Sequence, residues 1–483
     1  MKVLLAASEA TPFVKTDNLA DFAGALPRAV HKHGVDIRVV LPLYEAVNPL
    51  WRNKMTLVLS TTVALSWRQL YCGVHMLIED GIVYYFIENE FYFRRTGIYG
   101  HFDDGERFSF FSRAIVELMA RLDWRPDIVH LNDWQTALVP IYMKELSGEY
   151  PVLNKIKSVF TIHNIIYQGR FSRDILTDVC GISESWFEDG TLEFMDNVSM
   201  LKGAILTADY VTTVSPSYAE ELRFPFYAKG LEGAISSISD HFCGILCGLD
   251  TGLYNPETDP AIRYNYTSSE IEKKKHNKRH LQILLKLNDA PDIPIIAFVG
   301  KLVYGNGVDL IASAFERIMR QNIQFIVMGT GDYDYEKFFS SAETKYKGRV
   351  SANITNSDEL ARRIYAGGDF LLMPSQNEPC GKAQMIAMLY GMLPIVRETG
   401  GLKDTVGQYN PATGDGNGFL FSDYNANAMI EAITAAVDLY NSGSVHRNIM
   451  IRNNMKSDFS WNRTALQYIK LYGDMLCRGR DNE

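Results

Sequence analysis

The residues whose types and spacing best suit chemistry lie between positions 374 and 402. Glu378 follows a short apolar run that we predict to be a buried strand, and Gly400 and Gly401 follow the next such run. In α/β sheets, ligand-binding groups lie on loops at the carboxyl ends of the strands, and these three residues have that placement. A site for a sugar nucleotide is therefore the first hypothesis.

Polar and aromatic groups also follow two predicted strands earlier in the chain. Asp133 and Trp134 follow one of them, and His163 and Asn164 follow the next. Such groups suit a hydroxyl-rich ligand, because aromatic rings stack on sugar faces and Asp, His or Asn bind hydroxyls. A lone histidine is more often structural, but two successive clusters favour a functional His163.

Lys15 lies between the first predicted strand and a helical pattern at Phe22–His31. A lysine, a loop and a helix start can together bind an anion, because free backbone N–H groups and the positive helix end point at the ligand. A surface lysine before an ordinary helix cap gives the same pattern. The sequence leaves both interpretations open.

These residues need parallel sheets to position them, and the apolar pattern predicts two. Short β-branched runs without polar alternation, typical of strands covered on both faces, recur with helical patterns between them. In the first half we predict strands at Lys2–Ala7, Asp36–Leu41, Asp127–Leu131, Ser158–Ile162 and Tyr210–Ser215. In the second half we predict strands at Ile295–Val299, Gln324–Met328, Phe370–Met373 and Pro394–Val396, and a helix at Asp309–Met319.

The stretch at 247–256 is rich in structure-breaking residues and has no periodicity, so we place a domain boundary there. We expect an α/β protein with two domains, at 1–245 and 246–460. Ligands in such chains usually bind where the strand ends of both domains face a shared cleft, and the motifs should converge there. The charged run at 272–278 is expected to be a solvated helix face.

Length and composition limit the function. The chain has 483 residues, 47% of them hydrophobic and 22% charged, which is typical of a globular protein of two or three domains. Its net charge of -9 argues against nucleic acid or an anionic membrane as a partner, because both require a clustered positive face. No run approaches the roughly 18 apolar residues of a membrane-spanning helix.

The six cysteines are scattered along the chain, so reduced thiols in the cytoplasm are expected. Cys243 and Cys247 form the one close pair, with His241 beside them. A metal site there is the alternative to structural cysteines, but no second ligand pair with zinc spacing accompanies them. We expect no metal.

Several motifs together resemble the bacterial glycogen (starch) synthase family. They occur in the family's order from Lys2 to about Trp461, so the resemblance covers nearly the whole chain. The motifs are Lys15-Thr16, His130–Leu138, Thr161–Gly169, Val214–Glu221, Glu378–Gly381 and Thr399–Leu402.

The resemblance implies a retaining glucosyltransferase with two Rossmann-like domains facing across a cleft, the GT-B type. Such an enzyme adds glucose from ADP-glucose to the non-reducing end of an α-1,4-glucan such as glycogen, without a metal or other cofactor. The first domain would bind the acceptor and the second the nucleotide sugar. The last helix, near 461–483, would cross back to the first domain, and Trp461–Met475 fits this.

The resemblance also implies roles for individual residues. Glu378, His163 and Lys301 would be catalytic, since a departing nucleoside diphosphate needs its growing negative charge stabilised by fixed donors and cations. The acceptor side would include Asp133 and Tyr92, although core packing is an equal alternative for Tyr92. The donor would be bound by Lys15, Cys247, Asn306, Thr399, Gly400 and Gly401.

The chain departs from the family pattern around the donor phosphates. Asp17 and Asn18 replace two glycines after Lys15-Thr16, Lys301 replaces an arginine, and Asn306 replaces a lysine. The family's Asn-Gly-Ile-Asp is Cys247-Gly248-Leu249-Asp250 here, and Gln376-Asn377 replaces the basic residue before Glu378. A carboxylate 4 Å from a negative charge of the diphosphate would oppose donor binding by on the order of 1 kcal/mol in water.

Three hypotheses remain open. The chain is an active glucan synthase that uses ADP-glucose. Alternatively, it is a weak or inactive paralogue that binds glucan or another enzyme of glycogen metabolism as a regulatory subunit. The third hypothesis is a glycosyltransferase of the same fold with another donor.

Overall fold

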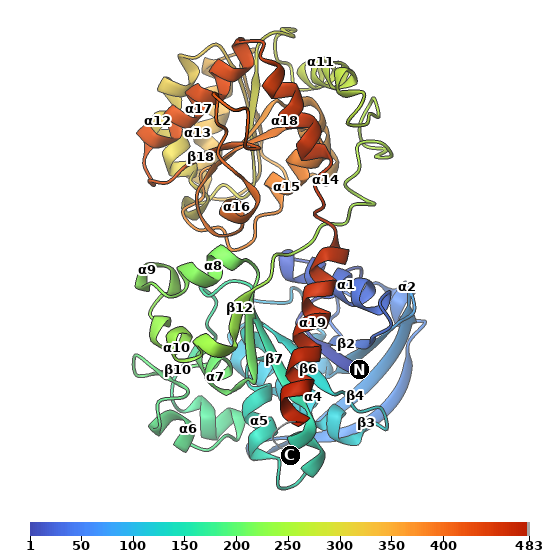
Figure 1. The fold of residues 1–483 in the computed structure, drawn as a ribbon. Helices are drawn as coiled ribbons and strands as arrows, with labels where there is room; N and C mark the ends of the chain where they lie inside the picture. The colour runs from blue at the N-terminus through green and yellow to red at the C-terminus, as the bar shows by residue number, and fades with distance from the viewer. Residues whose placement is uncertain (481–483) are drawn as a thin grey trace. The chain divides into compact units, whose positions relative to one another are not determined.

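The computed structural model describes residues 1–480, which form two compact units (Figure 1). Unit 1 contains Met1–Gly248 and the C-terminal segment that begins at Trp461. Unit 2 contains Leu249–Ser460. The predicted α/β class with two parallel, Rossmann-like sheets is confirmed, one sheet in each unit.

Unit 1 is built on a nine-stranded sheet in the order β12-β11-β7-β6-β1-β2-β5-β4-β3. The strands from β12 to β5 run parallel, and β4 and β3 add an antiparallel extension. Its strands are β1 (Lys2–Ala6), β2 (Asp36–Pro42), β3 (Thr56–Leu65), β4 (Arg68–Glu79), β5 (Ile82–Glu88), β6 (Ile128–Asn132), β7 (Lys157–Ile162), β11 (Tyr210–Thr213) and β12 (Phe242–Gly244). A small sheet joins β8 (Arg170–Phe171), β10 (Asn197–Ser199) and β9 (Glu193–Phe194).

The helices of unit 1 bury apolar faces against this sheet. In α1 (Asn18–His31), the buried residues Leu19, Phe22, Leu26 and Val30 recur at helical spacing. The other helices before the linker are α2 (Pro49–Arg52), α3 (Glu90–Phe93), α4 (Asp104–Arg121), α5 (Val139–Glu145), α6 (Ser185–Glu188), α7 (Met200–Thr207), α8 (Pro216–Glu221), α9 (Pro225–Ala228) and α10 (Glu232–Ser237).

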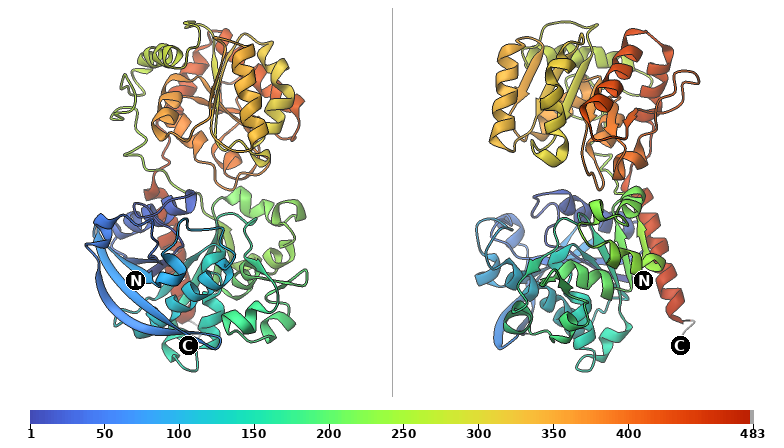
Figure 2. Two further views of the ribbon diagram at one scale, coloured as in Figure 1. Left: turned by 180° about the vertical axis from the view of Figure 1, so that it is seen from behind. Right: turned by 90° about the vertical axis from the view of Figure 1, so that its left-hand side faces the viewer.

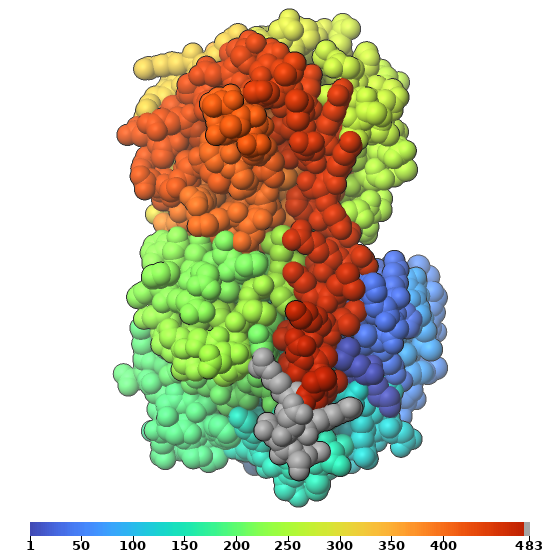
Figure 3. Space-filling model, in the orientation of Figure 1, coloured from blue at the N-terminus to red at the C-terminus, as the bar shows by residue number. Residues whose placement is uncertain are grey.

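The last helix, α19 (Trp461–Arg480), packs on unit 1 against α1, as the resemblance implied (Figures 1 and 3). Its Tyr468 and Tyr472 rings are fully buried. The Tyr472 hydroxyl lies 2.7 Å from Nδ1 of the buried His130 on β6. A segment more than 200 residues from the rest of unit 1 in sequence thus completes its core.

Unit 2 contains a six-stranded, all-parallel sheet in the order β15-β14-β13-β16-β17-β18, with helices packed around it (Figure 2). Its strands are β13 (Ile295–Val299), β14 (Gln324–Met328), β15 (Val350–Asn353), β16 (Phe370–Met373), β17 (Leu393–Arg397) and β18 (Phe419–Phe421). Its helices are α11 (Lys274–Leu284), α12 (Val308–Met319), α13 (Tyr333–Lys345), α14 (Asp358–Gly367), α15 (Ala383–Leu389), α16 (Gly400–Thr405), α17 (Ala426–Asn441) and α18 (Val445–Met455).

Each strand predicted from the sequence is present, with ends that differ by at most two residues. The sequence analysis did not predict β3, β4, β5, β12, β15 or β18. Of these, β3 and β4 contain many exposed and half-buried positions and do not form one buried apolar run. One prediction is right only in part: in the charged run at 272–278, Glu272, Lys273, Lys275 and His276 are exposed, but the other residues are not. Lys274 and Lys278 are buried in α11, whereas Lys275 is exposed.

In the part of the chain that the structure describes, no helix has the length and apolar character needed to cross a bilayer.

The joint between α19 and the linker gives a first prediction. A Cβ on Gly248 would lie 2.6 Å from the Trp461 Cα, a backbone atom that cannot rotate away. We expect Gly248→Ala to destabilise unit 1 by about 1–3 kcal/mol, as overpacking typically does, and to lower the unfolding temperature by several degrees.

Gly473→Ala is the matched control. Gly473 lies in α19, the helix that begins at Trp461, and a Cβ there meets nothing within 4 Å. Alanine favours a helix over glycine by about 1 kcal/mol, so this variant should be as stable as the parent or more so. Calorimetry of both variants is the measurement, and equal melting temperatures would contradict the packing argument.

Candidate active site

The candidate residues of unit 1 follow the carboxyl ends of adjacent strands. Glu9 follows β1, Asp133 follows β6 and His163 follows β7. The sheet order reverses direction on either side of β1, whose neighbours are β2 and β6. Ligands of open α/β sheets bind at such a switch point.

Asp133 is a strained and buried residue. Its backbone φ is 56°, in the left-handed region that side chains other than glycine rarely adopt. Its Oδ1 accepts a 2.8 Å hydrogen bond from the backbone N–H of His163. Burial raises the pKa of Asp133 to about 7, against the lowering effect of hydrogen bonds from the His163 and Asn164 backbones.

His163 is held in one orientation by its neighbours. Its Nε2 lies 2.9 Å from the Asn132 Oδ1, and the Phe22 ring contacts it edge-on with centroids 4.7 Å apart. The Asn132 side chain in turn donates to the Ala6 carbonyl. His163 is thereby coupled to the ends of β1 and β6 as well as to its own strand.

Glu9 was not identified from the sequence, and it organises the Lys15 loop. Its Oε2 accepts from the Thr16 N–H at 2.6 Å and from the Thr16 hydroxyl at 2.9 Å. Burial raises the pKa of Glu9 to about 7 despite these bonds, and the nearby Asp17 charge raises it further. Its signal in the sequence is a carboxylate three residues after a buried strand.

The Lys15 ammonium pairs with Asp21, at 2.8 Å from Oδ1. The adjacent Asp17 caps α1, because its Oδ1 accepts from the Asn18 N–H. Both carboxylates therefore lie at the helix start where the sequence suggested an anion site. The region holds more negative charge than that hypothesis assumed.

Two other candidates of the first half follow the carboxyl ends of other strands of the sheet, Tyr92 after β5 and Cys247 after β12. The Tyr92 side chain is fully buried, and its hydroxyl donates to Glu106. This geometry favours the packing interpretation. Cys247 is also buried and belongs to unit 1, next to the Gly248 contact with α19.

In unit 2, Lys301 follows β13, Glu378 follows β16 and Thr399 follows β17. Ser375 donates to the Glu378 Oε2 at 3.2 Å. The Asn306 side chain donates to the Lys301 carbonyl at 3.0 Å, so it closes the loop that carries this lysine. The Gln376 N–H donates to the Gly305 carbonyl and joins the loops after β13 and β16.

Gly400 and Gly401 allow two loops to touch. A Cβ on Gly401 would lie 1.7 Å from the Cys380 carbonyl oxygen, and one on Gly400 would lie 2.1 Å from the Glu378 carbonyl oxygen. The Gly401 N–H donates to this Glu378 carbonyl at 3.1 Å. The glycines thus position the backbone of Glu378, and the Gly401 N–H is already used within the protein.

Arg397, at the end of β17, is a further residue that sequence reasoning missed. It is buried, and it donates to the carbonyls of Ser375, Gln376 and Ser422. Its bonds to the Ser375 and Gln376 carbonyls therefore hold the segment that precedes Glu378. The family motifs gave no signal for it, because its role depends on contacts across the sheet.

No group of three or more His, Cys, Asp or Glu side chains within residues 1–480 could hold a metal ion.

Two family models match the chain. Residues 2–237 match the starch synthase catalytic domain, and residues 284–456 match the glycosyl transferases of group 1. Together with the two Rossmann-like sheets, they define a glycosyltransferase of the GT-B fold.

The similarity to glycogen synthases extends over the full length. The chain is 45% identical to the glycogen synthase of Desulforamulus reducens and 45% identical to that of Caldicellulosiruptor bescii, covering 99% of this chain and 100% of each relative. The catalytic domain of starch synthase IV from Arabidopsis thaliana, solved with ADP and acarbose, has a TM-score of 0.88 at 31% identity, with 99% of each chain covered. The chain belongs to the glycogen (starch) synthase family.

The buried Asp133 predicts a pH dependence of stability. Its folded pKa, about 7, lies above the ordinary value of 3.8, so the folded state binds more protons than the unfolded state between these values. Its contribution to stability is present at low pH and is lost as the pH rises toward 7. Asp133→Asn, which keeps the acceptor for His163, should reduce this loss and raise the melting temperature at pH 8.

Melting temperatures of both proteins between pH 5 and 8 are the measurement. Asp123→Asn is the control, because Asp123 is exposed and its substitution should leave the profile unchanged. Parallel profiles for the parent and Asp133→Asn would show that Asp133 ionises normally in the folded protein.

Proposed function

We propose that this protein transfers glucose from ADP-glucose to the non-reducing end of an α-1,4-glucan, with retention at the anomeric carbon. The observation that carries the proposal is the full-length identity of 45% to glycogen synthases. The retained loops after β7, β16 and β17 support it, since they hold His163, Glu378 and the glycine pair.

In the proposed reaction, the bond between glucose C1 and the ADP oxygen breaks, and the acceptor hydroxyl bonds to C1. The leaving diphosphate gains negative charge, which Lys301 would stabilise as a fixed cation. Glu378, whose backbone the glycine pair positions, would bind the sugar near the reacting carbon, and His163 would bind a glucose hydroxyl. The electron pair of the broken bond stays on the ADP oxygen, and the proton of the acceptor hydroxyl passes to this oxygen as ADP leaves.

The proposal assigns acceptor binding to 1–245, where Asp133 lies, and donor binding to 246–460. Lys15, Thr399 and Gly400 would contact the donor. Asn306 would contribute mainly by holding the Lys301 loop, as its bond to the Lys301 carbonyl supports. For Cys247 and Gly401, burial and an internally used N–H favour a structural role. The cytoplasmic location and a second enzyme as partner stay predictions.

A weak or inactive glucan-binding paralogue is the second candidate. The observation that favours it is the ion pair between Lys15 and Asp21, with the Asp17 carboxylate close by. A donor diphosphate would have to compete with these carboxylates for Lys15. The two candidates differ in one measurable property, which is glucose transfer.

Incorporation of radiolabelled glucose into glycogen tests the proposal directly. With ADP-glucose as donor, the parent protein should exceed Glu378→Ala by at least about a hundredfold, the scale on which a lost transition-state interaction acts. Equal incorporation in both proteins, with glycogen still retarding the protein in an affinity gel, would favour the paralogue. Parallel assays with UDP-glucose as donor test whether the protein prefers ADP-glucose.

The charge of Asp17 can be removed without removing the cap, since Asn caps helices as well as Asp does. A carboxylate near a diphosphate opposes binding by about 1 kcal/mol in water. We therefore expect Asp17→Asn to tighten ADP binding about fivefold with little change in melting temperature. Calorimetric titration with ADP is the measurement, and Lys15→Met should change affinity in the opposite direction. Unchanged ADP affinity in both variants would place the phosphates elsewhere.

A further inference from the structure

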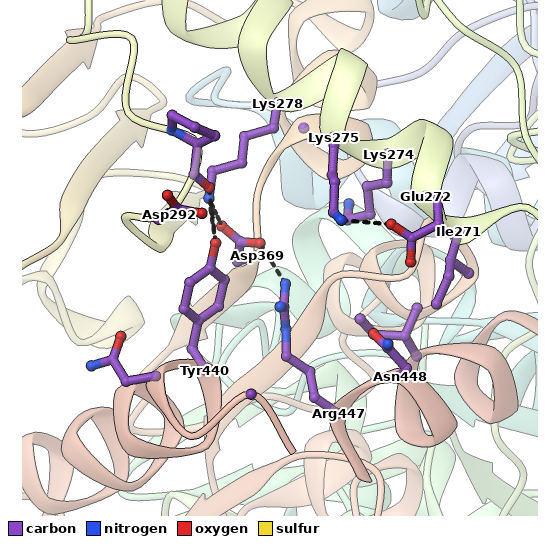
Figure 4. Close-up of a pocket in the computed structure, with 15 residues that line it drawn as sticks. Ile271, Glu272, Lys274, Lys275, Lys278, Asp292, Asp369, Tyr440, Arg447 and Asn448 are labelled. Carbon is purple, nitrogen blue, oxygen red and sulfur yellow. Dashed lines mark hydrogen bonds and ion pairs between the residues drawn. The ribbon is translucent and has the colours of Figure 1, made fainter. Parts of the chain in front are cut away.

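Unit 2 contains a cavity of about 520 Å³ whose lining includes none of the candidate active-site residues (Figure 4). It is lined by residues of α11, α17 and α18 and by the segments that precede β13 and β16. Lys301 and Glu378 follow the carboxyl ends of these two strands, whereas the cavity lies at their amino ends. It is therefore distinct from the candidate active site.

The floor of the cavity is an ion cluster around Asp369, the residue before β16. Its Oδ1 accepts from Arg447 Nη2 at 3.0 Å, and its Oδ2 lies 2.9 Å from Lys278 Nζ. Oδ2 also accepts from the Ile295 N–H at 2.9 Å. The side chains of Lys278 and Asp369 are 6% and 5% exposed. Two cations thus share one buried carboxylate, which leaves an excess of positive charge.

The Tyr440 side chain holds these two cations together. Its hydroxyl accepts from Lys278 Nζ at 2.7 Å, and its ring lies 4.1 Å from the Arg447 guanidinium carbon. Arg447 is 27% exposed. Apart from the Nη2 bond to Asp369, its guanidinium makes no hydrogen bond within residues 1–480, so Nε and Nη1 are available to a ligand.

Lys274 adds no free donors to the cavity. Its ammonium is buried and donates to the carbonyls of Tyr365, Ala366 and Tyr390, which uses all three of its N–H groups. Burial lowers the pKa of Lys274 to about 7, so at neutral pH this side chain carries only part of a positive charge. On the rim, Lys275 is 76% exposed and pairs with Glu272, so it can turn toward a ligand at little cost.

Asp292 also lines the cavity, and it has no ion-pair partner in the described part of the chain. A carboxylate there repels an inorganic anion but accepts hydrogen bonds from hydroxyls. Cations and a free carboxylate on one cavity suit a ligand with a phosphate at one end and hydroxyls at the other. The volume is within the range of small-molecule sites and exceeds what a phosphate ion alone needs.

We propose that this cavity binds a sugar monophosphate, with the phosphate on Arg447 and Lys275 and the sugar hydroxyls on Asp292. Arginine suits this role because its planar fork matches two phosphate oxygens. The site is separate from the glucosyl transfer site, and ligand binding there does not require the protein to be an active transferase.

Calorimetric titration of the full-length protein with glucose 1-phosphate, inorganic phosphate and glucose tests the proposal. Glucose 1-phosphate should bind most tightly. Arg447→Gln should weaken it about tenfold or more, as expected for a lost charge-assisted hydrogen bond. Lys275→Gln should weaken it a few-fold, because that side chain is exposed. Asp292→Asn should weaken glucose 1-phosphate more than inorganic phosphate.

Two controls separate this site from others. Lys347→Gln, at an exposed lysine of unit 2 outside the cavity, should leave binding unchanged. Glu378→Ala should also leave it unchanged, which excludes binding at the transfer site. The proposal is wrong if Lys275→Gln and Asp292→Asn, neither of which alters the buried cluster, both retain the parent affinity. Loss of binding in Glu378→Ala, or equal affinity for phosphate and glucose 1-phosphate, would also overturn it.

Discussion

Backbone contact between neighbouring strand-end loops is the constraint on which the candidate site of unit 2 depends. Residues 400 and 401 lie so close to the Glu378–Cys380 backbone that any Cβ would overlap a carbonyl oxygen. Arg397 supports the same loop through two carbonyl contacts, to Ser375 and Gln376, and a third contact links it to Ser422 after β18. The position of the Glu378 side chain therefore follows from the absence of side chains on the adjacent loop and from one buried cation.

Unit 1 reaches a comparable result with buried polar groups instead of glycines. Asp133, Asn132 and His163 hold one another across two strands, and Glu9 holds the Lys15 loop. Burial raises the pKa of both carboxylates to about 7. Such groups lower stability when they ionise, and groups of this kind are concentrated at functional sites. The loss of stability that their ionisation causes is explained by a role in binding or catalysis, not by a contribution to folding.

The sequence predicted most of the parallel strands and the strand-end motifs, because buried β-branched runs and their polar ends are local patterns, but it missed the parallel strands β5, β12, β15 and β18. It could not show what a residue contacts across the sheet. Glu9 and Arg397 carry no motif, yet each holds a loop. The opposite error occurred at Lys274 and Lys278, where a charged run suggested solvent but the structure buries both against carbonyls and Asp369. A run of charged residues in the sequence does not show which of them are buried when their partners are distant in sequence.

The departures from the family pattern also look different once their contacts are known. Asp17 caps α1 and Asn306 closes the Lys301 loop, so each stabilises the loop in which it lies. Lys15, which precedes Asp17, pairs with Asp21. The Lys15 and Asp21 side chains are 52% and 28% exposed, and an ion pair at such a surface contributes only about 0–1 kcal/mol. A diphosphate with two or more negative charges can displace it. The magnitudes therefore favour a transferase with a weakened donor site over one that cannot bind its donor.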